Sequence, residues 1–147
     1  MVGDEQVRAQ IMRPRPPVGL IAAECWQLLA SVPVGRVVFT MDALPAIRLV
    51  NHVTDGEKII IRSHLGAAIT GRAIGGAIVC YEADEVDLSR HTGWSVSVTG
   101  SARLITDPAE AVRYLHLLQP WAAGDKDQFV AIEPQLVTGV RLPGWCC

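Results

Sequence analysis

The sequence predicts a mainly β domain built around a small, mostly antiparallel barrel. Half of the 147 residues are hydrophobic and only 19% are charged, which suits one packed core. Strand-like segments outnumber helical ones, and turn signals link several of them directly. Strands of this number and length favour closure into a barrel, because a closed sheet has no exposed edge strands.

Three helices are expected. Apolar residues recur at helical spacing over residues 21–32, and Pro33 ends that helix. A short helix is expected over residues 65–74. The Asp107-Pro108 pair combines an N-cap residue with a proline suited to the first helical position, and it begins a helix that runs to about residue 119.

Strands fill most of the remaining chain. Glu133-Pro134 is expected to break the last strand region into two, and polar loops are expected over residues 84–93 and 121–127. β-Branched and aromatic residues predict strands over residues 36–40, 46–53, 58–63, 77–83, 94–105, 128–132 and 136–142.

Composition also bounds the partners and the compartment. A formal charge of −2 gives no excess positive field for a nucleic-acid backbone, so no nucleic-acid partner is expected. No apolar run approaches the roughly 20 residues of a membrane span, and no secretory signal opens the chain. We expect a cytoplasmic protein in which residues 1–17 form a flexible arm and residues 18–147 form one domain.

Signatures of metal binding and of covalent catalysis are absent from the sequence. The histidines are scattered and no cysteines form a Cys-x-x-Cys pair, so no metal site is predicted. No nucleophile elbow, zinc-protease motif or phosphate-binding loop is present, and no catalytic residue is assigned. The adjacent Cys146 and Cys147 carry no predicted role.

The Asp55-Gly56 pair predicts a hairpin and brings polar side chains together. If these two residues form the turn, Arg62 and Asn51 share one sheet face. An arginine, a serine hydroxyl and a helix N-terminus within five residues then form a candidate anion site, unless Arg62 is an ordinary surface or dimer-interface arginine. The same register pairs Thr54 with Glu57, Val50 with Ile61, Asn51 with Ile60, Leu49 with Arg62 and Arg48 with Ser63.

Seven segments, in this order and spacing, together resemble the pyridoxamine 5′-phosphate oxidase-like family, in particular its small actinobacterial branch. The resemblance extends over about residues 20–142 and implies a split β-barrel that forms a homodimer and binds FMN at the subunit interface. The segments that carry it are residues 25–29, 34–39, 45–53 with Asp55-Gly56, 59–63, 81–84, 93–100 and 137–142.

The resemblance also implies roles for particular residues. Arg62 would be the main charge partner of the FMN phosphate, and the isoalloxazine ring would lie mainly against backbone groups of one strand. The implied site residues are Arg48, Leu49, Val50 and Asn51 at the ring; Ile61, Arg62, Ser63 and His64 toward the phosphate; and Trp94, Ser95 and Val96 from the second subunit.

One departure from the family pattern affects the expected cofactor. Relatives that bind FMN tightly usually carry a lysine at the helix start after this arginine, where this chain has Ala67-Ala68. The leading prediction is a flavin-binding oxidoreductase with an unassigned small-molecule substrate, and vitamin B6 oxidation is not predicted. The alternatives are a deazaflavin-dependent reductase on the same fold, or a cofactor-poor dimer with a binding or stress-related role.

Overall fold

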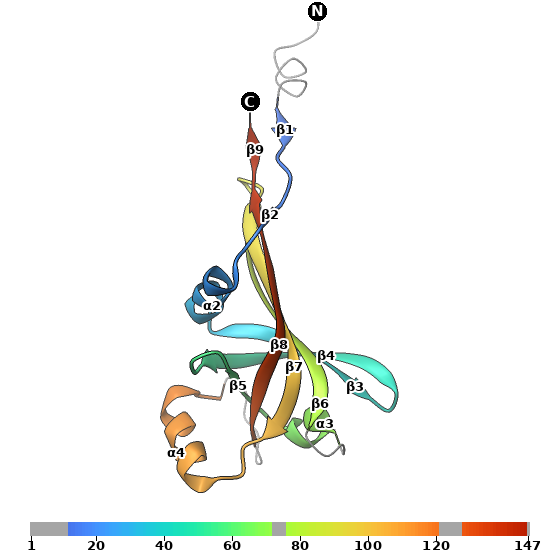
Figure 1. Cartoon of the computed structure of the whole chain (residues 1–147), viewed down its shortest axis with the longest axis vertical. Helices are drawn as coiled ribbons and strands as arrows, with labels where there is room; N and C mark the ends of the chain where they lie inside the picture. Colours follow the sequence, from blue (N-terminus) through green and yellow to red (C-terminus); the bar gives the residue numbers. More distant parts are fainter. Residues whose placement is uncertain (1–11, 72–75, 121–127, 147) are drawn as a thin grey trace, which may run out of the picture.

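A computed structural model describes residues 12–71, 76–120 and 128–146. Within these residues, seven strands form one antiparallel sheet in the order β2-β8-β5-β4-β3-β6-β7, and a further pairing of β8 with β7 closes a ring (Figure 1). The predicted mainly β split barrel is therefore confirmed. The ring strands are β3 (Val34–Met41), β4 (Leu44–Thr54), β5 (Ile59–Ser63), β6 (Ala77–Asp87), β7 (Thr92–Leu104) and β8 (Gln128–Pro143).

In the described part of the chain, three helices lie around the ring, close to their expected positions. They are α2 (Ala22–Ser31), α3 (Gly66–Thr70) and α4 (Pro108–Leu117). The predicted cap of α4 is confirmed, because the Asp107 carboxylate accepts a hydrogen bond from the Ala109 amide at 3.1 Å. No helix of the described residues is long and apolar enough to cross a membrane.

The strands β6, β7 and β8 extend beyond the ring toward the two chain ends (Figure 1). There β1 (Arg13–Pro14) pairs with β9 (Trp145–Cys146), and β2 (Val18–Gly19) pairs with β8. Part of the segment predicted as a flexible arm thus lies along the C-terminal residues. The rest of it, residues 1–11, is outside the described residues.

Two apolar clusters hold the described part of the fold together. The three isoleucines of β5 show the division, because strand alternation turns Ile59 and Ile61 into the barrel and Ile60 toward α4. We call the interior cluster the barrel core; it includes Leu29, Val37, Ile59, Ile61, Tyr81, Val96, Val98 and Ile132. We call the outer cluster the α4 core; it consists of Ile60, Ile105, Tyr114, Leu118, Phe129 and Ala131.

The predicted register of the β4–β5 hairpin is wrong by two residues. Asp55 and Lys58 exchange backbone hydrogen bonds at 2.9 and 3.2 Å, so Gly56 and Glu57 form the turn. Gly56 has a φ of +60°, which places the glycine at the first turn position instead of the second. A two-residue shift leaves every side chain on its expected face. The observed pairs are His52 with Ile61, Val53 with Ile60 and Thr54 with Ile59.

Two predicted interruptions are also corrected. Glu133-Pro134 does not break β8. The strand accommodates Pro134 through a shift in its register with β7, where Pro134 lies opposite Gly100. A Cβ atom at Gly100 would lie 1.8 Å from the Glu133 carbonyl oxygen, so the glycine permits this close approach. The expected loop over residues 84–93 is instead a tight turn that joins two long strands, and the Asp87 carboxylate accepts hydrogen bonds from the amides of Ser89 and Arg90.

Candidate functional site

The barrel splits where β4 and β5 part. β4 pairs with β3 from Leu44 to Asn51, but it pairs with β5 only over residues 52–54. Beyond the pair of His52 with Ile61, β5 continues to Ser63 on β8 alone. Among the described residues, the β4 segment 44–51 therefore has one edge without a strand partner. The backbone N–H and C=O groups on that edge can pair with a ligand, and the predicted ring-binding residues 48–51 lie on this segment.

The four predicted ring-binding residues of β4 go from exposed to buried along the strand. Arg48 and Leu49 are exposed, and Arg48 donates to the neighbouring Ile47 carbonyl at 2.7 Å. Val50 is buried in the barrel core. Asn51 is buried as well, and its side-chain amide donates to the Gln119 carbonyl just beyond α4.

Arg62 lies on the same face as Asn51, as the strand alternation predicts. Its guanidinium donates to the Leu118 carbonyl at 2.9 Å and lies over the Phe129 ring, 5.3 Å from the ring centroid. Arg62 and Asn51 therefore bind consecutive carbonyls at the C-terminal end of α4. This arrangement is electrostatically favourable, because a helix C-terminus carries partial negative charge.

The structure does not bring the other predicted anion-site groups to Arg62. Ser63 points to the opposite face of β5, where its hydroxyl accepts a hydrogen bond from the Leu65 amide at 3.0 Å. The Ala67 amide at the start of α3 donates to the Gln128 side chain at 3.1 Å. His64 is exposed in the turn between them, and Ile61 is buried in the barrel core.

The predicted second-subunit residues lie in the extended part of the sheet. Trp94 pairs with Glu85 and Arg141, and Ser95 with Asp84 and Val140, so these residues pair with β6 and β8 and not with β4 or β5. Trp94 packs with its side chain in the barrel core, as does Val96. Within one chain, these residues are therefore not part of the split.

Comparison with known proteins identifies the family. The family model for pyridoxamine 5′-phosphate oxidase matches residues 22–141. The chain belongs to this family. The protein Rv0080 of Mycobacterium tuberculosis is 48% identical over 139 residues, which are 92% of this chain and 91% of Rv0080.

Solved structures of two other bacterial proteins are among those similar to this chain. One is described as a pyridoxamine 5′-phosphate oxidase of Corynebacterium glutamicum, with 31% identity and a TM-score of 0.74 over 86% of this chain and 98% of that one. The other is a FAD-binding protein of Mycobacterium smegmatis, with 36% identity and a TM-score of 0.68 over 84% and 98%.

A buried histidine that the sequence analysis left unassigned lies beside the split in this family member. His52 Nε2 is 2.8 Å from the Leu29 carbonyl, and Nδ1 contacts the Tyr81 hydroxyl. A carbonyl only accepts, so Nε2 carries the proton and the tyrosine donates to Nδ1. Burial lowers the pKa of His52, which keeps the ring neutral, and raises the pKa of Tyr81. Gly35 leaves space for this contact, because a Cβ there would lie 2.5 Å from the Tyr81 hydroxyl oxygen, but no pattern in the sequence pointed to it.

Helix α4, which carries the carbonyl partners of Arg62, is itself anchored by polar contacts. The Asp55 carboxylate accepts a hydrogen bond from the Tyr114 hydroxyl at 2.6 Å and also pairs with Arg113. Arg103 of β7 reaches Glu110 at 3.3 Å. Sequence spacing could not reveal the contacts of Asp55, because they join positions 58 and 59 residues apart in the chain.

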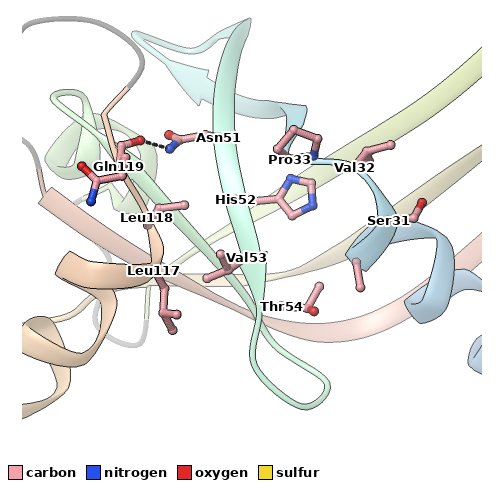
Figure 2. Close-up of a pocket in the computed structure, with 11 residues that line it drawn as sticks. Ser31, Val32, Pro33, Asn51, His52, Val53, Thr54, Leu117, Leu118 and Gln119 are labelled. Carbon is pink, nitrogen blue, oxygen red and sulfur yellow. Dashed lines mark hydrogen bonds between the residues drawn. The ribbon is translucent and has the colours of Figure 1, made fainter.

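A cavity of about 560 Å³ lies between the ends of α2 and α4, with β4 as its third wall (Figure 2). Figure 2 shows Asn51 pointing toward Gln119 and His52 pointing the other way, toward Pro33. The lining residues are Ala30, Ser31, Val32, Pro33, Asn51, His52, Val53, Thr54, Leu117, Leu118 and Gln119.

One charged cluster lies on the outer wall of the barrel. Arg36 of β3 contacts the carboxylates of Glu82 at 3.4 Å and Asp84 at 2.9 Å, both on β6. Desolvation, together with the hydrogen bond and charge of Asp84, raises the pKa of Glu82 to about 7, while Arg36 opposes the shift. Two carboxylates therefore share one guanidinium on this wall.

Proposed function

We propose that this protein binds a flavin nucleotide at the split between β4 and β5 and supports redox chemistry on a small molecule. The observation that carries the proposal is the unpartnered edge of β4 beside Arg62. Family membership supports it, as does the 36% identical FAD-binding protein of M. smegmatis. When bound, the flavin supplies the electron transfer, and the chain supplies binding and orientation.

The residues at the split suit such a ligand. The backbone groups of residues 48–51 can donate to and accept from the heteroatoms of a flat heterocycle, as they would to a neighbouring strand. Arg62 supplies positive charge for a phosphate, and a guanidinium with five N–H donors can serve a carbonyl and a phosphate together. The buried pair of His52 and Tyr81 fixes β4 against α2 and β6, so the edge is rigid.

The proposal includes a homodimer in which Trp94, Ser95 and Val96 of the second copy complete the site. Exposed apolar side chains gather on the outer face of the sheet, where a cross-strand row runs from Ile47 through Val38, Cys80 and Thr99 to Leu136. Such a face favours association, because a second copy would remove apolar surface from water. Large apolar residues on this face are Ile47, Leu49, Ile78, Leu136 and Val140, each at least 40% exposed.

A deazaflavin-dependent reductase is the second candidate, and the start of α3 favours it. Ala67-Ala68 supplies no charge, and the nearby backbone amides of Leu65 and Ala67 already bond to Ser63 and Gln128. A phosphate at the split therefore depends mainly on Arg62. If the flavin phosphate binds weakly, two alternatives are favoured. One is a cofactor that is held through its ring and other groups, and the other is a binding protein that holds little cofactor.

The test is a fluorescence titration of FMN, FAD and a deazaflavin into the wild type and the Arg62→Ala variant. Loss of a charged hydrogen bond costs about 1.5–3 kcal/mol, so FMN affinity is expected to fall roughly ten- to a hundredfold. Arg90→Ala is the matched control, because Arg90 is exposed and forms an ion pair with Asp87. Arg103 is unsuitable, since it contacts α4.

The outcomes separate the candidates. Equal FMN affinity for wild type and Arg62→Ala would place the phosphate elsewhere. No binding of FMN or FAD with clear binding of the deazaflavin would support the second candidate. Sedimentation of the wild type as a stable monomer at micromolar concentration would contradict the shared site.

A further inference from the structure

The cavity between α2, β4 and α4 has an unusual electrostatic character. Among the described residues that line it, none is Lys, Arg, Asp or Glu, and His52, the one histidine of this set, is held neutral by burial. Its polar lining side chains are those of Ser31, Asn51, His52, Thr54 and Gln119.

Two helices end at this cavity, and both present their C-terminal ends. α2 ends at Ser31 and α4 at Leu117, and both residues line the space. Unpaired carbonyls at a helix C-terminus carry about half a negative charge. The last turn of α2 contains no basic residue, so its own side chains do not balance this charge. At the end of α4, His116 lies in the last turn and Arg62 donates to the Leu118 carbonyl, so the negative character of the cavity is strongest at the α2 end.

The donors of the lining side chains are directed into the protein's own backbone. Ser31 donates its hydroxyl proton to the Leu28 carbonyl at 2.6 Å. His52 donates to the Leu29 carbonyl, and Asn51 donates to the Gln119 carbonyl. What Ser31 and Asn51 offer to a ligand is therefore mainly oxygen lone pairs.

We propose that this cavity is the substrate subsite and that it binds a compact molecule through N–H donors or a cationic nitrogen, while it disfavours phosphates and carboxylates. Its volume of about 560 Å³ is within the range of small-molecule sites. Asn51 belongs both to the cavity and to the β4 edge at the split, so a ligand here would lie beside the flavin. The assignment as substrate subsite rests on the proposed function, whereas the ligand preference rests on the cavity itself.

The test uses three probes of similar shape and different charge: benzamidine, benzamide and benzoate. Each is titrated into the ¹⁵N-labelled full chain, with and without FMN, and binding is followed by amide chemical shifts. We expect benzamidine to bind at least tenfold more tightly than benzoate, with benzamide between them. The largest shifts should be at residues 30–32, 51–54 and 117–119.

A charge variant sharpens the test. Ser31→Lys places an ammonium group at the end of α2, where an exposed lysine is compatible with the helix. It should weaken benzamidine about tenfold and bring benzoate to equal or tighter binding. Gln27→Lys, exposed on the same helix but outside the cavity lining, should change neither.

Two results would overturn the inference: benzoate binding as tightly as benzamidine to the wild type, or shifts that map away from the cavity. The result of the flavin titration is independent of the ligand preference of the cavity. Benzamidine binding in the cavity without any flavin binding would uphold the ligand preference and overturn the assignment as a substrate subsite.

Discussion

The barrel core and the α4 core are held together in different ways. The barrel core lies inside a ring of strands whose backbones hydrogen-bond to one another, and α2 and α3 pack against it. The α4 core is covered by one helix that is fixed by side-chain contacts at Asp55, Arg62 and Arg103. The barrel core is thus enclosed by backbone hydrogen bonds, whereas the cover of the α4 core depends on a few polar side chains.

This difference explains why the candidate site is at the boundary between the two cores. Arg62 and Asn51 belong to strands of the rigid ring, yet both side chains bind carbonyls at the end of α4. A ligand that displaces those carbonyls would act on the less firmly held element and leave the barrel intact. The free energy of local unfolding is generally lower for an element that few backbone hydrogen bonds join to the rest of the fold.

The largest expected effect comes from truncating one residue in each core. Ile61→Ala removes a fully buried side chain from the barrel core and should cost about 2–5 kcal/mol of the free energy of unfolding. Leu118→Ala should cost about 2 kcal/mol, because α4 can shift to fill part of the cavity. Urea denaturation measures both, and hydrogen exchange should show faster exchange confined to α4 in Leu118→Ala. Equal destabilisation with global loss of protection would contradict the distinction between the cores.

Patterns local in the sequence predicted the ring well. The β-branched and aromatic residues of segments 36–40, 58–63 and 94–105 predicted strands, and Asp107-Pro108 predicted a helix start; the structure contains each of them. The hairpin register was missed because an Asp-Gly pair is compatible with two turn positions, and the residues near the turn do not select between them.

The candidate site was predictable only in part. Strand alternation put Arg62 and Asn51 on one face, and they do bind adjacent carbonyls. The role of α4 could not be read from the sequence, since it depends on a contact between residues 62 and 118. Similarly, nothing near His52 in the sequence indicates that Tyr81 and Leu29 hold its two ring nitrogens.

A smaller effect is expected from loosening α4 without truncating its core. Tyr114→Phe removes the hydroxyl that donates to Asp55 and should cost about 0.5–1.5 kcal/mol. Because burial and Asp55 raise the pKa of Tyr114 to about 12, this contribution is present below pH 10 and is lost as the pH rises toward 12. Thermal melts of the wild type and variant should therefore converge across that range. A constant difference would show that the hydroxyl does not stabilise the helix through its proton.

The smallest expected effect is on the barrel wall, at Glu82. An unfolded glutamate titrates near 4.5, whereas the pKa of Glu82 in the folded chain is about 7. Between these values the folded state retains a proton that the unfolded state has released, so stability declines as the pH rises from 4.5 through 7. Glu82→Gln stays neutral and can still donate to Asp84, so it should not suffer this decline.

Glu82→Gln should therefore melt with the wild type at pH 5 and about 2 °C above it at pH 8, a small gain because the side chain is partly solvated. Glu85→Gln, exposed on the same strand, is the matched control and should show no such change between the two pH values. Salt should reduce the gain, because screening weakens the repulsion between Glu82 and Asp84. If Glu82→Gln instead altered hydrogen exchange in α4 and left the barrel strands unchanged, the two regions would not be energetically separate. The distinction between a barrel held by backbone hydrogen bonds and a helix held by side-chain contacts would then be wrong.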